Sequence, residues 1–371
     1  MPDSAEDARY MERALELARQ GLGATSPNPM VGAVLVKDGK VVGEGFHLYA
    51  GVKHAETLAL EQAREHAQGA TLYVNLEPCC HTGRTPPCAE ALLNAGVARV
   101  VAGMADPNPL VAGGGIQALQ EARVKVDVGV LEAACQTLNE HFARFVRSGR
   151  PFVTLKTAMT LDGKIAAGDG KGGWITGEMA RAYVHRLRHA HDALLTGVGT
   201  VMADDPLLTD RSVRPRRRPL LRVVLDSALR LPPASKVVEG AENDLMVVCG
   251  AAADSGRQRA LEARRVQVLR ASNAQPGIEW VLQELARREI QSVLVEAGAL
   301  INGAALQADV IDKVVVFFAP KLLGGGDAIP SFGGRGLGSL GSTRPVRVTA
   351  LQQIGEDILV EGYLHDVYRD R

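Results

Sequence analysis

Two cysteines, a histidine and a glutamate stand at spacings that suit a metal centre with one open position. His54 and Glu56 begin a predicted helix, Cys79 follows a predicted strand, and Cys88 lies nine residues further on. One imidazole and two thiolates can hold Zn²⁺ and leave a fourth position for water, whose pKa the metal lowers toward neutrality. A carboxylate beside the histidine can take a proton from that water and pass it to a leaving group.

The order H-x-E, then P-C and a second cysteine, is the signature of zinc nucleobase deaminases. We therefore predict three metal ligands, His54, Cys79 and Cys88. Glu56 is the predicted proton shuttle. Eight residues separate the two cysteines here, whereas the common signature has about two, so Cys80 and His81 remain alternative ligands. The side chains of adjacent cysteines rarely point at one ion. His81 is better explained as a residue that contacts substrate or as one that hydrogen-bonds to a metal ligand. A closed structural zinc site is the other explanation, but it has no need of Glu56.

The apolar pattern around this motif predicts an α/β domain over residues 1–147. Residues 30–36 and 40–46 are apolar runs joined by Asp38-Gly39, a strong hairpin signal. Helices and strands then alternate, which predicts a three-layer α/β/α domain whose later strands are parallel. The predicted helices cover residues 4–20, 54–68, 87–94, 116–123 and 131–146, and the later strands cover 71–76, 98–104 and 124–130.

A second α/β domain is predicted over residues 148–371, after the boundary sequence Ser148-Gly-Arg-Pro. Its last two predicted strands, 346–354 and 358–364, have no helix between them and are expected to pair antiparallel. Residues 324–341 are rich in glycine and predict a long loop of the kind often kept for binding. No G-x-G-x-x-G follows the first strand of either domain, so a Rossmann fold has no support.

The composition is that of an ordinary globular protein. Of 371 residues, 46% are hydrophobic and 23% are charged, which excludes disorder over most of the length. The 42 basic residues balance the 42 acidic ones, so we expect no nucleic-acid partner. No apolar run is long enough to span a membrane, and the N-terminus is polar and acidic, so we expect a cytoplasmic protein without membrane association. Five cysteines are too few for a disulfide scaffold.

Three segments of the first domain, 25–34, 54–56 and 77–88, resemble the deaminase domain of the bifunctional riboflavin-biosynthesis deaminase–reductases. The long interval between the two cysteines is that family's own pattern. The resemblance implies a cytidine-deaminase-like fold, one zinc ion on His54, Cys79 and Cys88, and Glu56 as the proton donor. It also implies that Asn28 lies beside the bound pyrimidine or its ribose.

Four segments of the second domain, 156–166, 173–176, 197–211 and 295–303, resemble the reductase domain of the same family, which has a fold similar to dihydrofolate reductase. By resemblance, the residues that contact NADPH would be Ala158, Trp174, Thr200, Asp204, Gly298, Ala299, Leu300, Ile301, Asn302, Gly303 and Ala304. The residues that contact substrate would be Arg188, Leu208, Arg211 and Glu296. Gly172 stands where the family often has a serine that contacts substrate, so that contact is not carried over.

Physical chemistry supports part of this assignment. The guanidinium groups of Arg188 and Arg211 suit a 5′-phosphate, and Trp174 offers a flat apolar face for a nicotinamide. Each has an ordinary alternative, because helix arginines usually face solvent and tryptophans usually lie in the core. The proton source for reduction is left open, with Lys156, Asp204 and Glu296 as candidates. The spacing of His47 predicts no role.

The resemblance implies two reactions on a phosphorylated pyrimidine. The first domain would deaminate 2,5-diamino-6-ribosylamino-4(3H)-pyrimidinone 5′-phosphate, and the second would use NADPH to reduce the ribosyl group to ribityl. A dimer or tetramer is expected from enzymes of this type. Two alternatives remain: a zinc deaminase of nucleosides or tRNA bases with a non-catalytic second domain, and a zinc-stabilised interaction protein. The low aromatic content, 4%, disfavours RNA binding.

Overall fold

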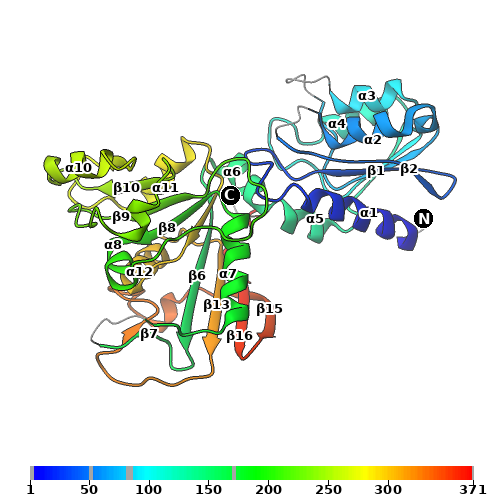
Figure 1. Ribbon diagram of the computed structural model, residues 1–371. Helices are drawn as coiled ribbons and strands as arrows, with labels where there is room; N and C mark the ends of the chain where they lie inside the picture. Colours follow the sequence, from blue (N-terminus) through cyan, green and yellow to red (C-terminus); the bar gives the residue numbers. More distant parts are fainter. Residues whose placement is uncertain (1–3, 50–52, 81–86, 169–172, 370–371) are drawn as a thin grey trace. The chain divides into compact units, whose positions relative to one another are not determined.

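A computed structural model describes residues 4–49, 53–80, 87–168 and 173–369 of the chain (Figure 1). They form two compact units. The first runs to Gly149 and includes the short segment Pro215–Arg217, and the second begins at Arg150. The bounds 1–147 and 148–371 remain our proposal for the two domains. No helix among the described residues is long and apolar enough to cross a membrane.

The first unit is built on a five-stranded sheet with the order β2-β1-β3-β4-β5. Its strands are β1 (Gly32–Lys37), β2 (Lys40–Phe46), β3 (Thr71–Val74), β4 (Arg99–Ala102) and β5 (Lys125–Val128). The β1–β2 hairpin turns at Asp38 and Gly39, which both have positive φ, as the Asp-Gly pair predicts. β1 pairs antiparallel with β2 and β3, whereas β3, β4 and β5 are parallel.

Helices cover both faces of this sheet. They are α1 (Ser4–Arg19), α2 (Ala55–Ala63), α3 (Cys88–Asn94), α4 (Gly114–Glu121), α5 (Glu132–Leu138) and α6 (Glu140–Ser148), with a 3₁₀ turn η1 (Arg64–Ala67). In Figure 1, α2, α3 and α4 lie on one face, and α1 and α5 lie on the other. A core of small and branched side chains, including Ala59, Leu72 and Leu92, fills the layer under α2 and α3. The predicted three-layer α/β/α architecture is confirmed.

Three predicted helix bounds of this unit are wrong. The helix predicted over 131–146 is two helices that meet at Asn139, whose side chain binds the backbone of Met30. The helix predicted over 54–68 ends at Ala63, because Arg64 adopts a positive φ. The helix predicted over 116–123 begins two residues earlier, where a distant carboxylate caps it.

The second unit is built on a nine-stranded sheet with the order β11-β10-β9-β8-β12-β6-β13-β16-β15. Its strands are β6 (Phe152–Thr160), β8 (Ala193–Gly197), β9 (Leu221–Leu225), β10 (Leu245–Cys249), β11 (Gln267–Arg270), β12 (Ser292–Val295), β13 (Lys313–Ala319), β15 (Arg347–Ile354) and β16 (Asp357–Tyr363). β15 and β16 pair antiparallel as predicted. A separate pair, β7 (Lys164–Ala166) and β14 (Ile329–Pro330), is not predicted from the sequence.

Helices also cover both faces of the larger sheet. They are α7 (Glu178–Ala190), α8 (Val198–Asp204), α9 (Lys236–Glu239), α10 (Ser255–Glu262), α11 (Ile278–Ala286) and α12 (Ala299–Gln307), with a 3₁₀ turn η2 (Leu340–Ser342). Leu194 of β8 packs with α8, α9 and α10, whereas its neighbours Ala193 and Leu195 pack with α11 and α12. The inner parallel strands β8, β10 and β12 are therefore buried on both faces, which explains their continuous apolar sequences, whereas the edge strand β15 is exposed.

Candidate active sites

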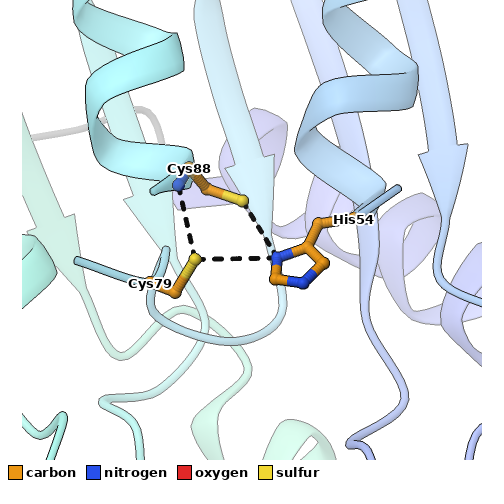
Figure 2. A group of neighbouring side chains, drawn as sticks. All are labelled: His54, Cys79 and Cys88. Carbon is orange, nitrogen blue, oxygen red and sulfur yellow. Dashed lines mark hydrogen bonds between the residues drawn. The ribbon is translucent and has the colours of Figure 1, made fainter. Parts of the chain in front are cut away.

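The three predicted metal ligands come from three elements and meet at one point (Figure 2). His54 directly precedes α2, Cys79 follows β3, and Cys88 is the first residue of α3. Nδ1 of His54 lies 3.2 Å from Sγ of Cys88 and 3.6 Å from Sγ of Cys79. Tetrahedral zinc, with bonds of about 2.0 Å to nitrogen and 2.3 Å to sulfur, separates such ligand atoms by about 3.5 Å. The donor set and its spacing therefore fit zinc.

The surroundings of the cysteines favour a thiolate. The backbone N–H of Cys88, at the start of α3, donates to Sγ of Cys79 at 3.3 Å. Hydrogen bonds from Cys88 and His54 lower the pKa of the Cys79 thiol to about 4. The contact with Cys79 and burial raise the pKa of the Cys88 thiol. Cys79 is therefore favoured as a thiolate, which is the form of cysteine that binds a metal.

Glu56 lies in the first turn of α2, two residues beyond His54, and its side chain is 4% exposed. Burial raises the pKa of its carboxyl, which also contacts Cys88. A carboxyl whose pKa is raised toward neutrality can both take up and give back a proton at physiological pH. The structure thus provides a proton carrier in a dry position beside the predicted ligands.

Cys80 points away from this cluster. It is exposed, and the described residues contain one cluster able to hold a metal, which consists of His54, Cys79 and Cys88. A Cβ atom built on Gly114 would come within 2.7 Å of the Cys80 sulfur, so that sulfur lies against the start of α4. The geometry therefore disfavours Cys80 as a ligand. His81 lies outside the described residues.

Glu77 is a site residue that sequence reasoning missed. It lies two residues before Cys79 and is 3% exposed. Its carboxylate accepts four backbone hydrogen bonds, from Asp106, Gly113, Gly115 and Ile116, at 2.9 to 3.1 Å. The two from Gly115 and Ile116 cap α4, and the other two fix the loop before it. The one signal in the sequence is that Glu77 is acidic although it directly follows the apolar strand sequence.

We expect Glu77→Gln to destabilise the first unit by about 1–3 kcal/mol. The glutamine NH₂ would face two backbone N–H donors, so buried donors would lose their acceptor. Calorimetric unfolding measures the change. Glu90→Gln, at an exposed position in the first turn of α3, is the matched control. Equal unfolding temperatures for the two variants would contradict the assigned contacts.

Asn28 lies beside a histidine to which the sequence assigned no role. The amide of Asn28 donates to Nε2 of His47 at 2.9 Å, because Nδ1–H of His47 donates to the carbonyl of Lys53 at 3.1 Å. The His47 ring stands edge-on to His54, with centroids 5.3 Å apart. Burial lowers the pKa of His47, which keeps its Nε2 an acceptor. No motif spacing reveals this contact, which arises only when β2 ends beside α2.

A buried charged cluster occupies the second unit. Lys156 lies in β6 and Glu296 directly follows β12. Val295 pairs with Leu155, so the parallel register sets Glu296 beside Lys156. The two carboxylate oxygens of Glu296 accept hydrogen bonds from Nε and an NH₂ of Arg188 in α7, at 2.8 and 3.0 Å. Nζ of Lys156 lies 3.8 Å from the same carboxylate.

Charge and burial shift the pKa values of Glu296 and Lys156 in opposite directions. Burial alone would raise the pKa of Glu296, but the charges of Arg188 and Lys156 lower it below its usual value. Burial lowers the pKa of Lys156, and the charge of Glu296 counteracts this in part. Glu296 is therefore an ionised anchor for two cations, and Lys156 is an ammonium that releases its proton more readily than an exposed lysine.

Two helices begin side by side at the carboxyl ends of β8 and β12, which are adjacent parallel strands. α8 follows β8, and α12 follows β12. A Cβ atom on Gly298 would lie 3.8 Å from Oγ1 of Thr200, so the two predicted cofactor segments meet there. Backbone N–H groups at helix starts suit phosphate groups. Asn302 is instead buried and donates to the carbonyl of Ser331 at 2.9 Å.

The other predicted cofactor and substrate residues of this unit have varied surroundings. Trp174 is 80% exposed, and the guanidinium of Arg181 lies 4.7 Å from its ring centroid. Ala158 is half-buried in β6, and Arg211 is exposed. Leu208 has a positive φ and its side chain is buried in the core, so any contact with a ligand has to come from its backbone.

Comparisons with known proteins find a matching family model for each half of the chain. Residues 4–104 match the family model for the cytidine and deoxycytidylate deaminase zinc-binding region, and residues 151–360 match that for the RibD C-terminal domain. The riboflavin biosynthesis protein RibD of Actinobacillus pleuropneumoniae is 42% identical over 357 residues, which cover 96% of this chain and 94% of that protein. The chain belongs to the RibD family.

Other RibD proteins are similar over nearly the whole length. RibD of Escherichia coli K12 is 40% identical over 364 residues, which cover 95% of this chain and 98% of that protein. The solved structure of Acinetobacter baumannii RibD has a TM-score of 0.86 at 41% identity and covers 97% of this chain and 99% of that chain. The chain is a bifunctional deaminase and reductase of riboflavin biosynthesis. The recognition of the family from the sequence is confirmed.

Proposed function

We propose that the chain deaminates 2,5-diamino-6-ribosylamino-4(3H)-pyrimidinone 5′-phosphate and then reduces its ribosyl group to ribityl with NADPH. The convergence of His54, Cys79 and Cys88 within 4.8 Å, with Glu56 buried beside them, is the observation that carries this proposal. A solved relative from Thermotoga maritima, 36% identical and with a TM-score of 0.83, is named as a diaminohydroxyphosphoribosylaminopyrimidine deaminase and 5-amino-6-(5-phosphoribosylamino)uracil reductase.

In the deaminase unit the proposed work of Glu56 is proton transfer. Zinc, when bound by His54, Cys79 and Cys88, would supply a water activated for attack near neutral pH. As the water oxygen bonds to the amino-bearing ring carbon, Glu56 takes a proton from the water. It delivers that proton to the amino nitrogen, so that the C–N bond breaks and ammonia leaves. Asn28, oriented by His47, would hydrogen-bond the pyrimidine or its ribose.

In the reductase unit we assign proton donation to Lys156. NADPH, when bound, supplies the hydride that C1′ receives. C1′ is a saturated carbon, so its bond to O4′ has to break as C1′ receives the hydride, and the ring oxygen needs one proton to become a hydroxyl. The lowered pKa of Glu296 argues against it as the acid, whereas Lys156 lies beside it and burial lowers its pKa, so that its ammonium gives up a proton more readily. Thr200 and the run from Gly298 to Ala304 are proposed for cofactor binding, together with Ala158, Trp174 and Asp204.

The 5′-phosphate fits Arg211 better than Arg188. Two of the nitrogens of Arg188 donate to Glu296, and the third donates to the carbonyl of Thr209 at 3.0 Å. Such a guanidinium holds the carboxylate and the segment before Arg211 in place. Arg211 is exposed at the end of that segment. The homo-oligomer, the absence of a nucleic-acid partner and the cytoplasmic location stay predictions.

The test is to incubate the protein with the diaminopyrimidinone phosphate and to follow ammonia and nicotinamide absorbance together. We expect Cys88→Ser to lose zinc and deamination, while NADPH oxidation on pre-deaminated substrate stays within about twofold of normal, because the second unit has its own core. Cys249→Ser, at a buried thiol of the second unit, is the matched control and should keep its zinc. Ammonia release from RNA without NADPH oxidation would instead favour a nucleic-acid deaminase.

A further inference from the structure

Two buried asparagine side chains hold the backbone of Met30. Asn139 accepts from the N–H of Met30 at 2.8 Å and donates to its carbonyl at 3.0 Å. Asn75 donates to the same carbonyl at 2.9 Å and accepts from the N–H of Gly32 at 2.8 Å. Asn139 is 2% exposed and Asn75 is fully buried. Three hydrogen bonds therefore fix the backbone of Met30, two residues beyond Asn28, and a fourth fixes that of Gly32.

Asn139 has a rigid base from which to make these contacts. Its N–H donates to the carbonyls of Cys135 and Gln136 at the end of α5, and its carbonyl accepts from the N–H of Ala143 in α6. The backbone of Asn139 therefore makes hydrogen bonds in both helices, whereas its side chain makes hydrogen bonds to Met30 outside them. The break in the predicted 131–146 helix falls at the residue that grips Met30.

The segment that Asn139 holds lies next to the metal cluster. Asn28 donates to His47, and the N–H of His47 donates to the carbonyl of Val31 at 2.9 Å. The His47 ring in turn contacts His54 edge-on. The loop from Asn28 to Val31 is therefore fixed at Met30 by the two asparagines and at its sides by His47. Loss of the Met30 contacts would leave Asn28 held by His47 and by the hydrogen bond from its N–H to the carbonyl of Thr25.

We propose that Asn139 is a positioning residue for deamination, which holds the loop of Asn28 in place to bind the pyrimidine by gripping the backbone of Met30. It acts through Met30 and does not contact substrate. The inference rests on the proposed role of Asn28. Asn139 is the better probe of the two asparagines, because Asn75 also adjoins the strand end that leads to Cys79.

The experiment measures deamination kinetics of Asn139→Ala and Asn139→Asp in the full-length zinc enzyme. In the aspartate variant a carboxylate oxygen would face the carbonyl oxygen of Met30. Both atoms are hydrogen-bond acceptors, so the contact would become repulsive. We expect both to raise the KM for the pyrimidine about tenfold or more. Their kcat should change less than about threefold, because the loss falls on binding shared by ground and transition states. Zinc content and NADPH oxidation should be unchanged.

Val97→Ala is the matched control. Val97 is buried in the same unit. It lies just before β4, at the amino ends of the parallel strands, whereas Cys79 follows the carboxyl end of β3. Its truncation should lower the unfolding temperature and leave KM unchanged. If Asn139→Ala lowers the unfolding temperature as Val97→Ala does and also keeps a normal KM, Asn139 is merely structural and the proposal is wrong.

A double variant tests whether Asn139 acts through Asn28. If Asn139 acts through Asn28, then Asn28→Ala with Asn139→Ala should have the KM of Asn28→Ala alone. Additive increases would overturn the proposal. A normal KM in Asn28→Ala would reject the role of Asn28 and this inference with it, whereas a raised KM in Asn28→Ala beside a normal one in Asn139→Ala would reject this inference only. No ammonia release by the unaltered enzyme would reject the proposed function itself.

Discussion

Glu56→Gln should lower the kcat of deamination about 10²- to 10⁴-fold while the protein keeps its zinc. Glutamine fills the same buried space in the first turn of α2 but cannot carry a proton from water to the departing amine. The ligands His54, Cys79 and Cys88 are unchanged, so metal content by elemental analysis should stay at the level of the unaltered protein. Ammonia release under saturating substrate measures the loss.

The control for this prediction lies on the same helix. Glu61 is exposed and pairs with Lys53, so Glu61→Gln changes the same charge without touching the cluster. It should keep normal deamination. Reduction of pre-deaminated substrate should be normal in both variants. If Glu56→Gln kept deamination within tenfold of normal, another group would have to move the proton, and an unchanged rate would favour a non-catalytic zinc site.

The meeting of His54, Cys79 and Cys88 could be predicted from the sequence because zinc chemistry restricts the residue types. Few residues bind zinc, so His54, Cys79 and Cys88 stand out with their spacing alone. The same holds for the hairpin at Asp38-Gly39, where the turn itself demands those residues. In both cases the residue types and their spacing form a recognisable motif, so no knowledge of tertiary contacts was needed.

The contacts that support the cluster were not predictable, because they join residues far apart in the chain. Glu77 caps α4 from 38 positions away, and the side chain of Asn139 reaches Met30 across 109 positions. Neither contact has a periodicity or a spacing that reveals it. They also explain two wrong helix bounds, since a cap from outside the helix and a side chain used elsewhere override local propensity.

The elements missed in the second unit have a different cause. α8 contains Gly199, Thr200 and Val201, which are weak helix formers, so its local pattern predicts a loop. It forms because Val198 and Val201 are buried against β8 and β9. The ion pair between Arg188 and Glu296 was likewise hidden. The family resemblance implies a substrate contact for each residue, and the fold also pairs the two with each other.

Replacing Lys156 should have the largest effect on the second reaction. Lys156→Met keeps the length of the side chain and removes the proton, so the kcat of reduction should fall about 10²- to 10⁴-fold. Deamination should be unchanged in the same preparation. Lys164→Met, at a lysine of the neighbouring β7, is the matched control and should retain reduction. NADPH oxidation on pre-deaminated substrate measures both.

The pH dependence of reduction identifies the acid more sharply than the rate alone. Lys156 must be protonated to donate, so the rate should be full at low pH and fall as the pH rises through its pKa, which burial sets below the usual value of 10.5. The negative charge of Glu296 holds that pKa up, so Glu296→Gln should move the fall to lower pH. A profile that kept its basic limb in Lys156→Met, or a limb that moved to higher pH in Glu296→Gln, would exclude Lys156 and return attention to Asp204, whose pKa burial raises.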